Sequence, residues 1–381
     1  MNIIIFIIIL LVLVVSHEFG HFIVAKMNKI RVDEFSFGFP PKLFGKKIGE
    51  TTYNFNLLPL GGYVKIFGES LDEADFLEVG FLDKGETPEK VEMSKRSMAY
   101  KPKYIQAMVL FAGITMNLLV AWLLLSIGFM SGLPTSVGNA PKGAIIQNQA
   151  LTITSVLAGS PAEIGGVKVG DKIISLDTPT DSTLLLSSNL GTESVQTFVK
   201  THGGEKVNLS LIRGKEPMNV IVVPEKSKTG DSVMIGISMD TIGTLKLPIH
   251  KAIWEGAKLT WDVTVGTVIG FYNLITSAVV GKADINSLTG PIGIVGVVGD
   301  AAKFGFIYLL SFTALISINL AVINLVPFPA LDGGRLLFLL IEKIKGSRIK
   351  PKIANTVNAI GFGLLMLLMV IITYHDIVKL L

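Results

Sequence analysis

Residues 14–26, VVSHEFGHFIVAK, follow the apolar run IIIFIIILLVL and place two histidines and a glutamate in a segment that otherwise suits lipid. Residues 2–25 are long enough to cross about 30 Å of bilayer hydrocarbon as one helix. A charged carboxylate in such a helix costs about 3 kcal/mol on insertion, so Glu18 would be expensive without a purpose. The segment therefore predicts a membrane helix that carries a functional site.

The composition agrees with a membrane protein. Of 381 residues, 50% are hydrophobic and only 17% are charged, which is too apolar for an ordinary soluble domain. Runs at about 104–130, 306–327 and 357–375 also meet the length for a span. The run at 263–280 meets it too, but a crossing there would place the basic loop at 343–352 outside, so we assign it to an interfacial helix. We expect a polytopic α-helical membrane protein with about four transmembrane helices.

Basic residues predict the orientation of these spans. Lysines and arginines gather at 26–47, 95–103 and 343–352, and the positive-inside rule places these loops in the cytoplasm. Residues 131–305 then lie on the opposite side of the membrane. The isoelectric point is near 9.0, yet the basic residues flank apolar runs and form no patch with aromatic residues, so no nucleic-acid partner is expected.

A β-rich segment at 143–226 separates the second span from the third. It combines the strand-like runs ALTITSVL, VNLSLIR and NVIVVPE with turn-rich stretches, which favours a small soluble domain. GSPAEIGGVKVGDKI and VQTFVKTHGGEKVNLSLIRG resemble a PDZ domain of the bacterial protease-associated kind. This resemblance implies a groove beside a helix at 195–200, with Val195, Phe198 and Val199 at the groove, where a peptide C-terminus could bind. A generic β-domain is the alternative.

The chain is accordingly divided into four parts. Residues 1–130 hold the first two spans, 143–226 the PDZ domain, 227–305 a linker with the interfacial helix, and 306–381 the last two spans.

His17 and His21 are four residues apart, so on a helix their imidazoles lie on one face and can share one ion. With Glu18 they form H-E-x-x-H, the arrangement in which two histidines hold Zn²⁺ and the glutamate takes a proton from a bound water. Zinc lowers the pKa of that water from about 15.7 to about 7. A polar cluster near the lipid headgroups is the alternative.

A catalytic zinc site usually has three protein ligands and one open position. The chain contains no cysteine, so a carboxylate at membrane depth is the ligand to look for. Asp332 is the only acid between Asp300 and Glu342, and the prolines and glycines at 327–334 allow irregular backbone around it. Asp332 is therefore the candidate third ligand, and a surface pair with Arg335 is the alternative.

HEFGH, LPLGGYVK, the PDZ region, GPIGI and NLVPFPALDGGR occur in the order found in the site-2 protease family. Over nearly its whole length the chain resembles an intramembrane zinc metalloprotease of the bacterial RseP type. The resemblance implies Zn²⁺ held by His17, His21 and Asp332, with Glu18 as the base. It also implies that Asn324 holds the substrate backbone or the transition state.

The same resemblance implies the location and the substrates. The protein would lie in the bacterial inner (cytoplasmic) membrane, with the active site toward the cytoplasm and the PDZ domain in the periplasmic or extracellular space. Its partners would be the lipid bilayer and single-span membrane proteins, such as anti-sigma factors or signal-peptide remnants. The chain departs from the family at Ile114, where proline is frequent, and in having one PDZ segment where the best-known member has two.

NFNLLPLGGYVKIFG, residues 54–68, resembles the membrane-reentrant β-hairpin of the family. At Gly61, Gly62 and Tyr63 an extended substrate could add as a strand to such an edge. This addition would satisfy the backbone groups of a substrate helix that has unwound. A cytoplasmic surface hairpin is the alternative.

Two functions of other classes compete with proteolysis. A catalytically silent membrane PDZ scaffold would have no need of the intact Glu18 and the three candidate ligands. A zinc transporter would need a continuous polar path and usually shows repeats, and no repeat of the spans is evident in the sequence.

Overall fold

The computed structural model describes residues 2–69, 95–141, 144–157, 159–179, 185–186, 190–214, 216–226, 232–281 and 290–380. The chain forms two compact units. The first comprises Met1–Ser126, Ile253–Ala302 and Leu309–Leu381, and the second comprises Ile127–Ala252 and Lys303–Tyr308.

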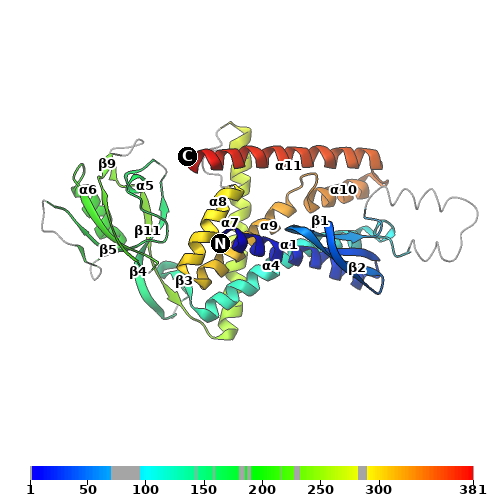
Figure 1. Ribbon diagram of the computed structural model, residues 1–381, viewed down its shortest axis with the longest axis horizontal. Helices are drawn as coiled ribbons and strands as arrows, with labels where there is room; N and C mark the ends of the chain where they lie inside the picture. The colour runs from blue at the N-terminus through cyan, green and yellow to red at the C-terminus, as the bar shows by residue number, and fades with distance from the viewer. Residues whose placement is uncertain are drawn as a thin grey trace, which may run out of the picture. The chain divides into compact units, whose positions relative to one another are not determined.

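Long helices and a β-hairpin make up the first unit (Figure 1). The longer helices are α1 (Asn2–Met27), α4 (Lys103–Ser131), α7 (Ile249–Val279), α8 (Pro291–Phe304), α9 (Phe306–Leu325), α10 (Asp332–Lys345) and α11 (Pro351–Leu380), and a 3-10 turn, η1 (Met98–Tyr100), precedes α4.

Four of these helices are long and apolar enough to cross a membrane. They cover Asn2–Met27, Lys103–Ser131, Phe306–Leu325 and Lys352–Val378, in agreement with the four predicted spans. Helix α7, which contains the fifth apolar run, is not among the candidates found in the described chain. Only 6% of the window in α11 is buried, as expected for a helix that faces lipid. The prediction of a membrane protein with four apolar helices is confirmed.

Small residues allow α1 and α4 to approach closely. A Cβ at Gly20 would overlap the backbone carbonyl of Ala112, so only glycine fits at this crossing. Leu13 of α1 is fully buried against Val298 of α8, and Ile318 of α9 packs on α4. These contacts fix α1, the helix with the two histidines, among α4, α8 and α9.

Strands β1 (Val32–Ile48) and β2 (Thr51–Ile66) form the hairpin, and β1 pairs with both halves of β2. Phe35, for example, lies opposite both Tyr53 and Val64. The segment 62–66 therefore lies at an edge of this small sheet, and its inner end packs on α1 and α4 through the buried Ile66. The second half of β1 exposes several apolar side chains, among them Leu43, Phe44 and Ile48.

A carboxylate fastens the turn of the hairpin. Glu50 accepts hydrogen bonds from Lys26 Nζ and Arg96 Nη2, each at 2.5 Å. Burial would raise the pKa of the Glu50 carboxyl, but these two cations outweigh it and keep the pKa below its ordinary value. The contact ties the turn to the C-terminal end of α1.

A seven-stranded antiparallel sheet forms the second unit, drawn in green in Figure 1. The strand order is β3-β11-β4-β5-β7-β8, with β6 paired to β5. The elements are β3 (Leu133–Ser136), β4 (Ile146–Val156), α5 (Pro161–Ile164), β5 (Lys172–Asp177), β6 (Leu185–Leu186), α6 (Thr192–Thr201), β7 (Val207–Arg213), β8 (Glu216–Val222) and β11 (Ile237–Leu245), with the 3-10 turn η2 (Val137–Asn139) and the short pair β9 (Glu225–Lys226) and β10 (Val233–Met234).

The sheet extends beyond the 143–226 boundary that was assigned to the PDZ domain. Strand β3 precedes that range, and β11 lies in the 227–305 segment assigned to a linker, where it pairs with both β3 and β4. Alternating apolar residues of β11 favour a strand, but its place between two distant strands depends on the tertiary fold.

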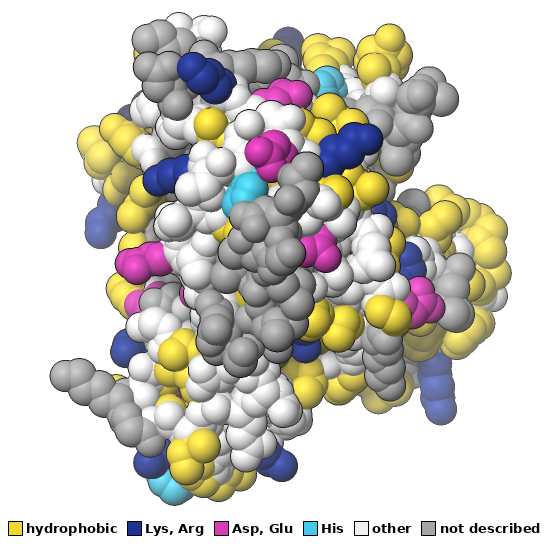
Figure 2. All heavy atoms as spheres, turned by 90° about the vertical axis from the view of Figure 1, so that its left-hand side faces the viewer, with side chains coloured by type: hydrophobic (Ala, Val, Ile, Leu, Met, Phe, Trp, Pro, Cys, Tyr) yellow, Lys and Arg dark blue, Asp and Glu magenta, His cyan; other side chains and the backbone are white. Residues whose placement is uncertain are grey.

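On the face drawn in Figure 2, acidic and basic side chains are interspersed, which is typical of a surface in water.

Candidate metal centre

Helix α1 brings the two predicted histidines together. Because one turn separates them, the rings of His17 and His21 lie 4.7 Å apart between centroids, and their Nε2 atoms are 3.1 Å apart. Both histidines are only 7% exposed, so two polar side chains are buried within an apolar helix. The H-E-x-x-H spacing therefore produces the shared face that the sequence predicts.

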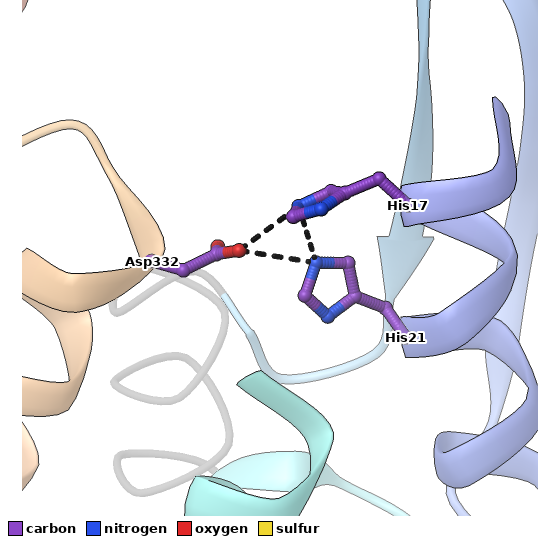
Figure 3. Close-up of side chains that lie close together, drawn as sticks. All are labelled: His17, His21 and Asp332. Atoms are coloured by element: carbon purple, nitrogen blue, oxygen red, sulfur yellow. Dashed lines mark hydrogen bonds and ion pairs between the residues drawn. The ribbon is translucent and has the colours of Figure 1, made fainter. Parts of the chain in front are cut away.

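Asp332, the first residue of α10, approaches the histidines from far along the chain (Figure 3). Its Oδ2 atom lies 3.0 Å from His17 Nε2 and 3.3 Å from His21 Nε2. The turn before α10 folds tightly onto the end of α9, since a Cβ at Gly333 would overlap the carbonyls of Leu325 and Val326. Gly333 thus allows the close turn that directs the Asp332 side chain toward α1.

Arg335 does not pair with Asp332 and instead forms an ion pair with Glu69. Burial would raise the pKa of the Asp332 carboxyl, but its contacts with His17 and His21 outweigh this effect and hold the pKa well below the usual range. The surface pair considered as an alternative for Asp332 is therefore wrong.

Glu18 lies beside this cluster without belonging to it. Its Oε2 atom accepts a hydrogen bond of 3.0 Å from the backbone N–H of Val64, in the edge segment of the hairpin. Glu18, His21, Val64 and Asp332 line a cavity of about 310 Å³ together with Ile66, Glu69, Ala330, Arg335 and Asn358. The Glu18 carboxylate, the edge segment and two of the three candidate ligands, His21 and Asp332, thus border one space.

The donor set fits a zinc ion. The three candidate ligand atoms lie within 4.8 Å of one another, and their separations of 3.0–3.3 Å are close to the roughly 3.3 Å expected between tetrahedral ligands at zinc distances. His21 Nδ1 lies 2.7 Å from the carbonyl of Val109, so the ring donates there and keeps the lone pair of Nε2 for a metal. A Cβ at Gly113 of α4 would overlap His21 Nε2, so glycine keeps this space open.

Other predicted site residues lie farther from the cluster. Asn324 is half-buried near the end of α9, and no hydrogen bond joins it to the three ligand candidates in the described chain. In β2, Gly62 is buried opposite Phe37, and Tyr63 Oη donates to Glu34. Gly61 has a positive φ of 150° and adjoins the edge segment.

The three residues assigned to the PDZ groove belong to the core of the second unit. Val195, Phe198 and Val199 are 0–5% exposed and pack against the sheet from α6. A helix was predicted here and is present, but the side chains that face outward from it are others, such as Glu193 and Gln196. Their burial favours a packing role, and the groove stays a prediction.

Sequence reasoning did not assign roles to several residues that surround the site, namely Val64, Val109, Gly113 and Asn117. Among these four, only Asn117 could have been singled out from the sequence, because an amide side chain inside an apolar span is costly unless it has a hydrogen-bond partner.

Comparison with known proteins places the chain in a family. A model of peptidase family M50 matches residues 5–368. The chain belongs to peptidase family M50. It is 34% identical over 377 residues to a Clostridium acetobutylicum protein provisionally named as a zinc metalloprotease, covering 99% of this chain and 97% of the relative.

Two further relatives carry the name RasP. The zinc metalloprotease RasP of Geobacillus kaustophilus is 31% identical over 444 residues, covering 99% of this chain and 98% of the relative. The regulator of sigma-W protease RasP of Bacillus subtilis is 30% identical over 443 residues, covering 100% and 99%.

Family membership confirms the recognition of a site-2-type zinc metalloprotease with Zn²⁺ as its cofactor. The roles of individual residues, the PDZ domain, the reentrant hairpin and the orientation in the membrane stay predictions.

Proposed function

We propose that this M50 peptidase cleaves single-span membrane proteins within or next to the bilayer, with His17, His21 and Asp332 as the ligands of Zn²⁺. The observation that carries this proposal is the convergence of these three side chains. Asp332 is 315 positions from His17 in the sequence, yet its carboxylate lies 3.0 Å from the imidazole of a residue in the first span. A metal requirement explains why three groups with lone pairs face one another in a buried place.

Glu18 acts as the general base in this proposal. Bound Zn²⁺ supplies Lewis-acid chemistry, which acidifies a water and polarises the carbonyl of the scissile bond. Glu18 lines the same cavity as His21 and Asp332 but lies outside the ligand cluster, so it can take the proton of that water. It can then donate the proton to the leaving amine.

The edge segment 62–66 binds the substrate as an added strand. A helical substrate hides its peptide bonds in its own hydrogen bonds, so it must unwind before attack, and its backbone then needs new partners in a lipid environment. Val64 lies at the outer edge of the hairpin, where its N–H donates to Glu18, so a strand added beside it places its backbone next to the base. Gly61, Gly62 and Tyr63 would contact it from the same segment, and Asn324 would hold the substrate or the transition state.

The hairpin enters the membrane in this proposal. The second half of β1 exposes Leu43, Phe44 and Ile48, apolar side chains that suit lipid better than water. By the positive-inside rule, the basic loops favour a cytoplasmic position for this end of α1 and the active site, and a periplasmic or extracellular position for residues 131–305. The named relatives are bacterial proteins, which supports a place in the bacterial inner membrane.

Anti-sigma factors and signal-peptide remnants are the proposed classes of substrate. The name of the Bacillus subtilis relative links that protein to sigma-W, and the proposal extends this kind of substrate to the present chain.

Glu18→Gln tests the assignment of roles. Glutamine still offers an oxygen to the Val64 N–H and leaves all three ligands in place, so the variant should bind one equivalent of zinc as the wild type does. Cleavage of a single-span substrate should fall by about 10²–10⁴-fold, the usual contribution of a general base. Zinc would be counted by elemental analysis of purified protein, and cleavage followed by gel.

Each outcome separates the competing functions. Zinc lost from the variant alone would show that Glu18 is a ligand. Zinc without cleavage in the wild type would favour a silent scaffold, and zinc moved across a vesicle membrane would favour a transporter.

The PDZ domain excludes substrates with bulky outer domains in this proposal, and recruitment of a peptide C-terminus is its rival. If it filters, removal of the sheet from β3 to β11 should allow cleavage of substrates with full-length outer domains. If it recruits, removal should reduce cleavage of substrates that are already short. Long and short versions of one substrate, tested on a truncated enzyme shown to bind zinc, distinguish the two; unchanged discrimination excludes the filter.

A further inference from the structure

The side-chain amide of Asn117 in α4 points at His17 Nδ1, the ring nitrogen that does not face the other candidate ligands. The Nδ2 atom of Asn117 lies 3.3 Å from His17 Nδ1, and Asn117 is 1% exposed. Ser317 of α9, which is fully buried, donates a hydrogen bond of 2.7 Å to the backbone carbonyl of Asn117. The asparagine is thus held between α9 and the histidine.

The tautomer of His17 decides whether it can bind a metal. A neutral imidazole carries one proton, so an Nε2 lone pair directed at a metal requires the proton on Nδ1. That proton needs an acceptor, because the site is buried. For His21 the acceptor is the carbonyl of Val109, 2.7 Å away. For His17, the side chain that reaches Nδ1 is the amide of Asn117.

One end of the Asn117 amide meets this requirement and the other does not. With Nδ2 toward the ring, two donors would face each other whenever Nδ1 carries the proton. The Oδ1 atom, meanwhile, is buried and has no hydrogen-bond partner among the described residues. The two ends have nearly the same shape, so rotation of the amide by half a turn costs little sterically and places Oδ1 on the Nδ1–H of His17.

We infer that Asn117 is a positioning residue whose Oδ1 accepts the Nδ1 proton of His17 and thereby directs the Nε2 lone pair of His17 to the zinc ion. This inference rests on the proposed metal site. Gly113, one turn earlier on α4, faces the same rings, because a Cβ there would overlap His21 Nε2. On this face of α4, Gly113 thus leaves space for the metal, and Asn117, one turn later, orients a ligand.

Two substitutions at one position test the role of the acceptor. Leucine is close to asparagine in size but cannot accept a hydrogen bond, so Asn117→Leu should weaken zinc binding by about 10–100-fold, as the loss of such partners usually does. Asn117→Asp offers only acceptor oxygens and should bind zinc as tightly as the wild type or more tightly. Zinc dissociation constants would be measured on the full-length protein in detergent micelles, by competition with a chromogenic chelator.

Gln106→Leu is the matched control. It removes a buried amide from the same helix, where Gln106 Nε2 donates to the carbonyls of Ala99 and Lys101 away from the metal ligands. Its zinc affinity should equal that of the wild type, which separates a general cost to the helix from an effect on His17.

The outcomes are distinct. Wild-type affinity in Asn117→Leu would overturn the inference while leaving the metal site intact, whereas absence of zinc from the wild type would overturn the metal site itself. A loss of about tenfold or more in Asn117→Asp, relative to the wild type, would show that the amide donates and does not accept. The aspartate variant decides this point even if the leucine variant fails to fold.

Discussion

Removal of Asp332 is the most direct perturbation of the proposed metal centre. The Asp332 carboxylate lies 3.0 Å and 3.3 Å from the two imidazoles, so no other group of the cluster can take its place without movement of the backbone. If about 12 kcal/mol of zinc binding is shared evenly by three ligands, Asp332→Ala loses about 4 kcal/mol, or roughly a thousandfold in affinity. Cleavage should be lost with the metal.

Thermal or denaturant unfolding with and without zinc measures this loss. At a free zinc concentration 100 times the wild-type dissociation constant, binding stabilises the wild type by about 2.7 kcal/mol and the variant by less than about 0.1 kcal/mol. Because Asp332→Ala also loses the contacts with His17 and His21, the metal-free variant should be less stable than the metal-free wild type, so the quantity to compare is the stabilisation that zinc adds to each protein.

Arg335→Ala is the control on the same helix. It removes the ion pair with Glu69 and leaves the three ligands in place, so its zinc affinity should stay within about tenfold of the wild type, as expected for a change outside the ligands. If Asp332→Ala retained wild-type affinity while Arg335→Ala lost it, the third ligand would lie elsewhere and the reasoning from geometry would be refuted.

Other positions give independent tests. Gly113→Ala should abolish zinc binding because its Cβ meets His21, whereas Gly363→Ala, which has open space, should bind normally when zinc content is measured. Single cysteines at Glu216 and Lys345, both exposed, should react with an impermeant reagent from outside and from the cytoplasm respectively; reversed labelling would invert the orientation. Glu50→Gln should lower the unfolding free energy by at most about 1 kcal/mol at neutral pH. This difference between variant and wild type should vanish as the pH falls below the ordinary carboxyl pKa of 4.5 and then through the lower pKa of Glu50 in the folded state, because only the ionised carboxylate is stabilised by its partners.

Features set by local spacing could be predicted from the sequence. The four helices follow from the length of their apolar runs, and the shared face of His17 and His21 follows from the helical repeat. Asp332 could be singled out as a candidate ligand because it is an isolated acid next to helix breakers at the end of the third predicted span.

Features that depend on pairing between distant strands could not be predicted from the sequence. The pattern of β1 does not show that it pairs with both halves of β2, and the sequence of β11 does not show that it lies between β3 and β4. Likewise, Val195, Phe198 and Val199 have the spacing of one helix face, but only the packed sheet reveals that this face is buried.

The proposed contribution of α4 to the metal centre could not be predicted from the sequence motifs, and the reason is chemical. Motifs mark the atoms that bind the metal, whereas α4 supplies a backbone carbonyl at Val109, a missing side chain at Gly113 and an amide at Asn117. A carbonyl is present in every residue and therefore leaves no trace in sequence. Of the three, only the glycine and the amide can be lost by substitution, so these two positions, rather than Val109, are where changes in α4 should affect the metal.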